Sequence, residues 1–202
     1  MTNYPTQLSQ ELKGLPDVVE QAQLNERGLY VVEGLNMQLA ELLVAASEQP
    51  HIGEYCPHDR AKRFGSVEKV TAWQSKGRLA LPLVRKVGDG ALSLAGFGWM
   101  GPGEPGEDDP IIPGATTVFA IRIYENAIGQ GNALPYTKAI VQAHDVLYGN
   151  KGVWLEAWCD NAAALTTYEK AGFEKVTERS GSHHGEPVTR VYMTLGQLAT
   201  NS

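Results

Sequence analysis

Residues 116–133 read TTVFAIRIYENAIGQGNA, and this stretch sets the class of fold within which the rest of the sequence can be interpreted. Its first part, 116–124, is rich in β-branched and aromatic side chains, which makes it the strongest strand candidate in the chain. A glycine-containing turn follows and leads into residues 132–148, where apolar side chains recur at helical spacing. Pro135 falls in the first turn of that helix, where a missing N–H is tolerated. The order of strand, turn and helix predicts an α/β connection.

The glycine turn, residues 128–133 (IGQGNA), has the features that an anionic ligand needs. Glycine lets the backbone approach a ligand closely, and the first N–H groups of a helix have no acceptor within the helix. Such a turn can bind a phosphate without a lysine or arginine side chain. Taken alone, the pattern fits either a phosphate site or a tight structural connection.

A second glycine pattern, residues 96–101 (GFGWMG), matches the dinucleotide-binding motif G-x-G-x-x-G letter for letter. That motif must open a helix, because the pyrophosphate rests on the N-terminal amides of the helix. Here Pro102 and Pro105 follow closely, and the same loop holds acidic residues that would repel a phosphate. We interpret 96–101 as the end of a strand that runs into a loop.

The remaining segments alternate between strand and helix patterns. Pro50 is expected to end a helix over 36–48, residues 51–64 show no clear period, and 101–114 and 180–187 are expected to form loops. Further strands are expected at 28–34, 79–86, 91–100, 153–159, 173–179 and 188–195, and further helices at 66–76 and 161–171. This order predicts a mixed α/β (α+β) fold without internal repeats.

Length and composition favour one ordinary globular domain. The chain has 202 residues, of which 43% are hydrophobic and 20% charged. Its 17 Lys and Arg against 23 Asp and Glu give a net charge of −6, without the basic excess that drives nucleic-acid binding. Cys56 and Cys159 form no spaced motif, and no export signal or membrane span is apparent, so we expect a cytoplasmic protein. We expect an N-terminal extension over 1–26, one domain over 27–198 and a tail over 199–202.

Residues 161–173, NAAALTTYEKAGF, read as N-x-x-A-x-x-x-Y-x-K-x-G-F and resemble the second signature of the GNAT superfamily of N-acetyltransferases. The turn at 128–133 is similar to the first signature, (Arg/Gln)-x-x-G-x-(Gly/Ala), with Ile128 where the family has Arg or Gln. The two stand in the family's order. The resemblance implies a GNAT-like, mostly antiparallel central sheet flanked by helices, whose splayed central strands hold acetyl-CoA as co-substrate.

The resemblance also implies roles for individual residues. Glu156 begins a stretch similar to the L-E-V-x-x-x-N strand of the ribosomal-protein alanine acetyltransferase branch. In that branch a Glu twelve positions before the Tyr accepts a proton. Glu156 lies twelve positions before Tyr168, so the resemblance implies the same role for it. An exposed strand glutamate without a role is the alternative. The acetyl-CoA contacts would be the main chain of Ile121, Arg122 and Ile123, the amides of Gly129, Gln130, Gly131, Asn132, Ala133 and Leu134, and Asn161 near the pantetheine arm.

The chemistry of acetyl transfer gives each group a task. Glu156 would take the proton of the attacking amine, directly or through water, and amides of the strand over 116–124 would polarise the carbonyl. Tyr168, with a pKa near 10 against roughly 8.5 for a thiol, would hydrogen-bond the departing thiolate. We predict an N-acetyltransferase that acts on a primary amine by direct attack in a ternary complex. A non-catalytic acyl-CoA-binding or regulatory module of the same fold is the alternative.

The remaining expectations concern metals and partners. His51, Cys56 and His58 lie close together in sequence and His183 and His184 are adjacent, but neither set has the spacing of a metal site, so no metal is expected. The acceptor is expected to be a small-molecule or peptide amine, and a homodimer is left open. Nucleic acid and membrane are not expected as partners. The negative net charge and four acidic loop residues favour a cationic acceptor; they are Glu104, Glu107, Asp108 and Asp109.

Overall fold

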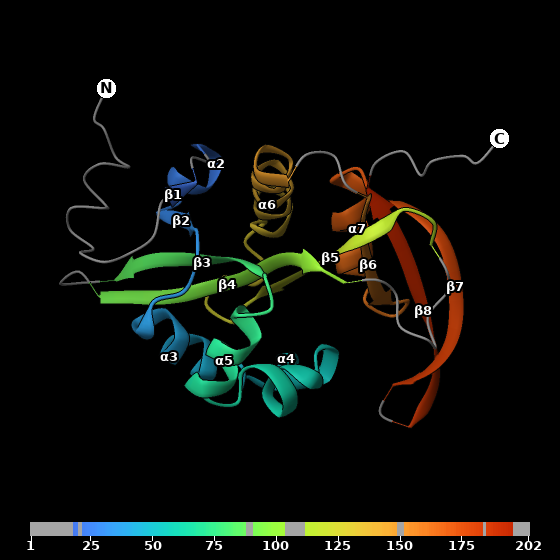
Figure 1. Ribbon diagram of the computed structural model, residues 1–202, viewed down its shortest axis with the longest axis horizontal. Coiled ribbons are helices and arrows are strands. Elements are labelled where there is room, and N and C mark those ends of the chain that lie inside the picture. The colour runs from blue at the N-terminus through green and yellow to red at the C-terminus, as the bar shows by residue number, and fades with distance from the viewer. Residues whose placement is uncertain are drawn as a thin grey trace.

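The computed structural model describes residues 18–19, 22–87, 91–103, 112–148, 152–183 and 185–195, which form one eight-stranded mixed sheet with helices on both faces (Figure 1). The strand order is β1-β2-β3-β4-β5-β6-β8-β7, and every neighbouring pair is antiparallel except β5 with β6. The strands are β1 (Val18–Val19), β2 (Leu29–Val32), β3 (Leu79–Val87), β4 (Ala91–Pro102), β5 (Ala115–Ile123), β6 (Gly152–Trp158), β7 (Glu174–His183) and β8 (Glu186–Leu195).

The helices form two layers, as Figure 1 shows: α2, α6 and α7 lie above the sheet, and α3, α4 and α5 lie below it. Each layer buries its own apolar cluster against the sheet. The helices are α2 (Ala22–Asn25), α3 (Met37–Ala46), α4 (Pro50–Tyr55), the π-helix η1 (Asp59–Arg63), α5 (Val67–Gln74), α6 (Ala133–Tyr148) and α7 (Ala162–Lys170). The predicted mostly antiparallel sheet flanked by helices is confirmed.

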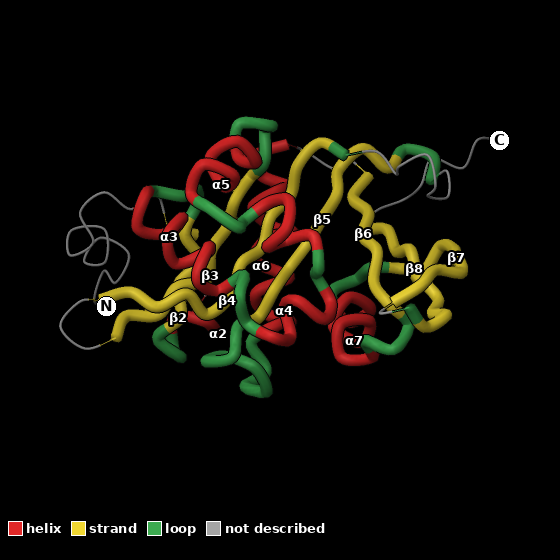
Figure 2. Tube along the Cα trace, turned by 90° about the horizontal axis from the view of Figure 1, so that it is seen from below, coloured by secondary structure: helices red, strands yellow, loops and turns green. Residues whose placement is uncertain are grey.

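The two central strands separate along their length. β5 and β6 are paired at Ala115 with Gly152, at Thr117 with Val153 and at Val118 with Trp154. Beyond those pairs β5 continues only against β4, and β6 only against β8. Seen from the side of α3, α4 and α5, strands β6, β8 and β7 form a wing beside β5 (Figure 2). The predicted splayed central strands are confirmed, and one edge of β5 is left without a neighbouring strand.

Local signals explain why several predicted helices formed. The side chain of Asn36 accepts a hydrogen bond from the backbone N–H of Leu39 at 2.9 Å and caps α3. Ser66 caps α5 by accepting from the N–H of Lys69 at 3.3 Å. Gly77, with a φ of +73°, lies just beyond the last turn of α5, where a left-handed residue commonly ends a helix.

Pro50 does not act as a stop. It occupies the first turn of α4, where proline loses only an N–H that would have had no helical acceptor. The stretch 51–64, for which no period could be predicted, therefore contains most of α4 and the whole of η1. Both segments are too short, at 6 and 5 residues, to display a helical repeat.

The loop expected at 180–187 is largely strand. β7 runs to His183 and β8 begins at Glu186, because Ser180 pairs with Thr189 and Gly181 with Val188. Glycine has low strand propensity, so the extension through Gly181 depends on pairing with β8. At the N-terminus, β1 and α2 fall within the segment over 1–26 that was expected to be an extension, and β1 pairs with β2.

The second glycine pattern is part of strand β4, as predicted. A Cβ atom at Gly98 would overlap the Cδ1 atom of Ile140, and one at Gly96 would lie 2.8 Å from the carbonyl oxygen of Arg122. These glycines therefore let α6 and β5 pack closely on β4. The acidic loop over 104–111 lies outside the described residues, and no helix that is described is long and apolar enough to cross a membrane.

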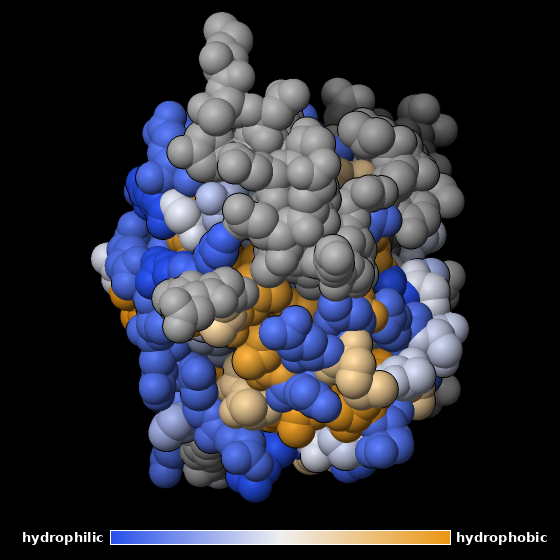
Figure 3. Space-filling view, turned by 90° about the vertical axis from the view of Figure 1, so that its left-hand side faces the viewer, coloured by the Kyte–Doolittle hydropathy of each residue, from blue (hydrophilic) through white to orange (hydrophobic). Residues whose placement is uncertain are grey.

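Apolar surface gathers at the end of the molecule where β3 and β4 turn, bordered by hydrophilic residues (Figure 3). Met37, the first residue of α3, and Val87, the last residue of β3, are exposed to 65% and 42%. In Figure 1 this end lies away from β6, β7 and β8. It therefore takes no part in the gap between the splayed strands.

Candidate functional site

A cleft of about 800 Å³ opens where β5 and β6 separate. Its floor is the free edge of β5 and the facing residues of β6, and one side is formed by the first half of α7. The glycine turn after β5 closes one end, while α4 and η1 overhang the other side together with Arg78 and Trp99. The topology thus brings both predicted signatures to one cavity.

The glycine turn has the conformation that a phosphate site requires. Gly129 and Gly131 have φ angles of +73° and +70°, a region that other residues rarely adopt. The backbone N–H groups of residues 129–134 form no hydrogen bond within the part of the chain that the structure describes. Six consecutive donors at the start of a helix therefore remain for a ligand, and the helix dipole favours a negative one.

Two arginines hold the turn from outside. Arg27 donates through Nη1 to the carbonyl oxygen of Gln130 at 2.9 Å and to the Oδ1 atom of Asn132 at 3.0 Å. Arg85 donates to the Gln130 side chain at 3.1 Å and to the carbonyl oxygen of Asn126 at 3.2 Å. Because the carbonyls are bonded on this side, the conformation that leaves the amides unpartnered is fixed. Neither arginine was recognised from the sequence, since the contacts span 103 and 45 positions.

The predicted contacts along β5 differ in orientation. His51 of α4 places its Nε2 atom 3.0 Å from the carbonyl oxygen of Ile123, so the main chain of Ile123 faces away from β4. Neighbouring residues of a strand direct their backbone groups to opposite edges. Ile121 therefore faces the cleft as well, whereas Arg122 directs its main chain toward β4.

The side chain of Arg122 has a different role from the main-chain contact predicted for it. It forms two hydrogen bonds with the carboxylate of Asp59, at 2.6 and 3.1 Å, and both side chains are buried. Burial by itself would lower the pKa of Arg122, but the neighbouring charge of Asp59 outweighs that effect and raises the pKa above its ordinary value. The pair ties η1 to the central strand, and it fixes the wall that overhangs the cleft.

Tyr168 lies in the cleft wall on α7 and is only 7% exposed. Its ring packs edge-on against Phe119 at 5.9 Å and lies the same distance from Phe173. Burial raises the pKa of Tyr168 above its ordinary value, and the positive charge of Arg122 offsets this only in part. The hydroxyl forms no hydrogen bond within the described residues, so it is a neutral donor available to a ligand.

Glu156 and Asn161 also line the cleft, where each already has a protein contact. The carboxylate of Glu156 on β6 lies 3.3 Å from the Nη1 atom of Arg190 on β8. The side-chain oxygen of Asn161 accepts from the N–H of Ala164 at 3.2 Å and caps α7. An incoming ammonium group would share Glu156 with Arg190, and only the amide nitrogen of Asn161 remains for a ligand.

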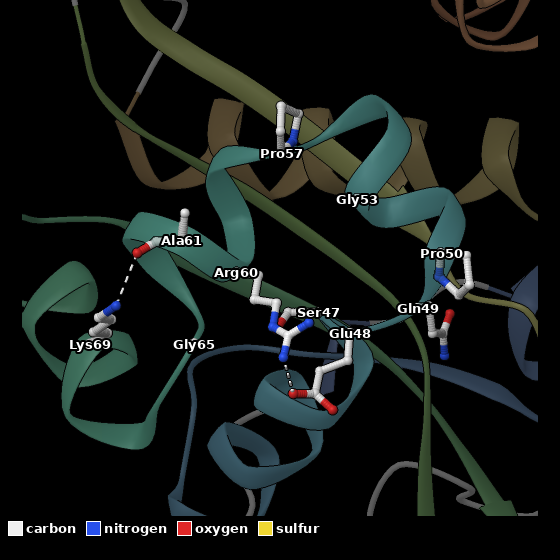
Figure 4. A pocket seen from close by; sticks show the side chains of 10 residues that line it. All are labelled: Ser47, Glu48, Gln49, Pro50, Gly53, Pro57, Arg60, Ala61, Gly65 and Lys69. Carbon is white, nitrogen blue, oxygen red and sulfur yellow. Dashed lines mark hydrogen bonds and ion pairs between the residues drawn. The ribbon is translucent and has the colours of Figure 1, made fainter. Parts of the chain in front are cut away.

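A second pocket, of about 490 Å³, lies behind η1 (Figure 4). Its charged side chains are engaged with the protein: Arg60 pairs with Glu48 at 3.1 Å, and Lys69 donates to the carbonyl oxygen of Ala61 at 2.9 Å. Among the described residues, no group of three or more His, Cys, Asp or Glu is placed to hold a metal ion. The cleft between β5 and β6 is therefore the stronger candidate site.

The sequence matches no protein-family model, and it matches no curated protein. The fold is nevertheless similar to solved structures. The aminoglycoside acetyltransferase AAC(6')-Ib, solved with paromomycin and acetyl-CoA, is 17% identical with a TM-score of 0.59, over 85% of this chain and 98% of that one. The spermidine N-acetyltransferase of Vibrio cholerae, solved with coenzyme A and spermine, is 14% identical with a TM-score of 0.62, over 83% and 96%.

A third structure with this fold is a Bordetella pertussis protein provisionally assigned to the GnaT family of acetyltransferases. It is 16% identical, with a TM-score of 0.58, over 82% of this chain and 95% of that one. Each comparison covers most of both chains, so the likeness includes the whole sheet. At these identities it shows that the fold is that of the acetyltransferases, and function has to be argued from the site.

Proposed function

We propose that a chain with this fold, and with this turn at the mouth of its cleft, is an acetyl-CoA-dependent N-acetyltransferase. The acceptor is a primary amine, which attacks the thioester directly in a ternary complex. The observation that carries the proposal is the run of six unpartnered amides over 129–134, at the end of the gap between β5 and β6. A pyrophosphate is the part of coenzyme A that such a run of amides would bind.

The residues fit the rest of the cofactor as well. The edge of β5 beyond Val118 has no neighbouring strand, so the amide groups of a pantetheine arm can pair with the backbone there. Ile121 and Ile123 both direct their backbone groups toward the cleft. The carbonyl oxygen of Ile123 already accepts from His51, so the backbone of Ile121, which has no hydrogen bond on this edge within the described chain, is the one available to the cofactor. The amide nitrogen of Asn161 is the donor that remains on the facing helix.

Acetyl-CoA, when bound, supplies an acyl group activated as a thioester. The backbone N–H groups of the β5 edge would stabilise negative charge as it develops on the carbonyl oxygen. Glu156 would accept the proton of the amine, directly or through a water molecule. Its position in the same cleft as Tyr168, twelve residues earlier in the chain, supports this role and the finer resemblance to the ribosomal-protein alanine acetyltransferase branch.

Tyr168 would donate a hydrogen bond to the departing sulfur. An unperturbed tyrosine already has a pKa about 1.5 units above that of a thiol, so complete proton transfer to the thiolate costs about 2 kcal/mol. Because burial raises the pKa of Tyr168 further, transfer becomes less favourable still. A hydrogen bond that strengthens as charge develops on the sulfur is therefore the role that this side chain can fill.

Release of free thiol from acetyl-CoA, measured across a panel of primary amines, tests the proposal. We expect release that depends on the amine, and a Tyr168→Phe variant that binds acetyl-CoA with unchanged affinity but turns over at least about tenfold more slowly. Binding of acetyl-CoA without thiol release from any amine would contradict transferase activity and would leave the acyl-CoA-binding module. Unchanged turnover in the variant would remove Tyr168 from the mechanism.

A further inference from the structure

The part of the cleft away from the glycine turn is rich in positive charge. Trp99 of β4 pairs with Ala120 in the middle of β5, whereas the glycine turn begins only after β5 ends. Two arginines from separate segments lie over the ring of Trp99, Arg63 at 5.8 Å and Arg78 at 4.5 Å from its centroid. Among the described residues that line the cleft, four arginines face one glutamate, Glu156; they are Arg63, Arg78, Arg122 and Arg190.

Arg78 is the least compensated of these. Its guanidinium lies over the ring of Trp99, 4.5 Å from the centroid, which fixes its position. Its Nε and Nη1 atoms are buried and have no hydrogen-bond partner among the described residues. Burial lowers the pKa of Arg78, and the nearby positive charge of Arg63 lowers it further. Burying the donors of a charged group without acceptors costs free energy. The two unpartnered donors of Arg78 therefore indicate that an anionic ligand binds here.

Two of the neighbouring arginines, Arg63 and Arg122, share one carboxylate. Asp59 accepts from Arg63 at 3.1 Å, yet the same carboxylate already takes two bonds from Arg122. Arg190 has Glu156 at 3.3 Å. Within the described residues, Asp59 is therefore shared by two guanidinium groups, and Arg190 is paired with Glu156. The pKa of His58 is lowered by burial first, and then by Lys62 and the two arginines Arg63 and Arg190, as expected where positive charge predominates.

We infer that the acceptor amine of this protein carries an anionic oxyacid group, a carboxylate or a phosphonate, which Arg78 binds with Arg63 beside it. The inference rests on the proposed function and specifies the substrate class of that site. It differs from the expectation of a cationic acceptor, which followed from the net charge of −6 of the whole chain and from four acidic residues of the loop over 104–111, outside the described residues. A guanidinium offers several N–H donors in one plane, a geometry that matches such oxyanions.

The test compares each amine with a partner that differs only in this charge. Free amino acids are assayed beside their amides, aminophosphonates beside their neutral esters, and spermidine and kanamycin serve as cationic acceptors, all with saturating acetyl-CoA. We expect an acid to exceed its neutral partner by about tenfold or more in kcat/KM, the factor that one charge-assisted contact supplies. Equal or better turnover of the neutral or cationic amines would overturn the inference and leave the proposed function intact.

Variants locate the effect at Arg78. In Arg78→Met the ratio of acid to neutral amine falls toward one, whereas Arg60→Met keeps it, because Arg60 is 67% exposed on η1 and pairs with Glu48 outside the cleft. Unchanged affinity for coenzyme A, measured on each variant, shows that the cleft is intact. A ratio that survives in a folded Arg78→Met variant would refute the role of Arg78.

A binding measurement separates failure of the inference from failure of the proposed function. N-acetylated amino acids and their amides are titrated calorimetrically into the wild-type protein loaded with coenzyme A. Tighter binding of the acid, by about tenfold, supports the anion site even if no amine is acetylated. Equal binding of the two overturns it even if turnover is observed. This measurement needs no variant, so it does not depend on how well Arg78→Met folds.

Discussion

Replacing Asp59 by Asn removes the carboxylate that compensates Arg122 beneath the cleft. The Arg122 side chain is 7% exposed and that of Asp59 is 2% exposed, so water cannot take over the lost interaction without a rearrangement. Arg63, which shares the same carboxylate at 3.1 Å, is 35% exposed and can turn outward. The cost of the substitution should therefore arise from Arg122.

Removing one partner of a buried ion pair costs about 3–5 kcal/mol, because the other charge stays buried and unpaired. For a protein of this size that corresponds to a fall in Tm of roughly 6–20 °C, which calorimetry or urea unfolding measures readily. Since the pKa of Arg122 is raised in the folded state, its contribution to stability is complete below the pKa of arginine in the unfolded chain and is lost only at strongly alkaline pH above it. The loss of stability should thus be constant between about pH 6 and pH 9.

The matched control is the exposed pair of Arg60 and Glu48, whose side chains are 67% and 59% exposed at a separation of 3.1 Å. Glu48→Gln should cost at most about 1 kcal/mol. In the double variant with Asp59→Asn and Arg122→Met, no uncompensated buried charge remains, so part of the loss should be recovered. A cost below about 1 kcal/mol for Asp59→Asn alone would refute the argument that this pair fixes η1 against β5.

Three further predictions concern the glycine turn, the tyrosine of α7 and the packing of α6. Arg27→Ala should weaken acetyl-CoA binding about threefold to tenfold in calorimetry, the value of one or two net hydrogen bonds, whereas the exposed neighbour Glu26→Ala should leave it unchanged. Ionisation of the proposed donor Tyr168 should cause no loss of kcat up to about pH 10, because its raised pKa keeps the hydroxyl protonated there. A fall in kcat with an apparent pKa below 10, seen in the wild type and absent from Tyr168→Phe, would contradict this. Gly98→Ala should lower the free energy of unfolding by about 1–3 kcal/mol, because the added Cβ overlaps with α6. Gly53→Ala in α4, where a Cβ meets nothing within 4 Å, should be neutral or stabilising. Equal effects of the two substitutions on the free energy of unfolding would contradict the predicted overlap.

Local chemistry explains why much of this fold could be predicted. β5 has the β-branched and aromatic composition of a buried strand, and its glycine turn and following helix formed where the sequence placed them. Asn36 and Ser66 act as the caps of their helices. These signals lie within a few residues of the structure that they specify, so one sequence is enough to recognise them.

The parts that were missed depend on contacts between distant segments. The polar residues at 180–183 became strand because β8 supplies the pairing, and η1 is positioned by an ion pair that spans 63 positions. Arg27 meets the glycine turn across 103 positions, so no local pattern could place it there. The arginines that line the cleft could not be predicted for a similar reason, because net charge describes the whole chain and not one site.

The contribution of the pyrophosphate to binding is the most direct measure of the proposal that the turn over 129–134 holds coenzyme A. Calorimetric titration of the wild-type protein with coenzyme A and with pantetheine, which lacks the nucleotide and the pyrophosphate, measures the contribution of these two parts together. We expect coenzyme A to bind at least about 100-fold more tightly, which corresponds to about 2.7 kcal/mol shared among several backbone amides. Equal affinity for the two ligands, or no binding of coenzyme A, would show that the six amides do not form the cofactor site.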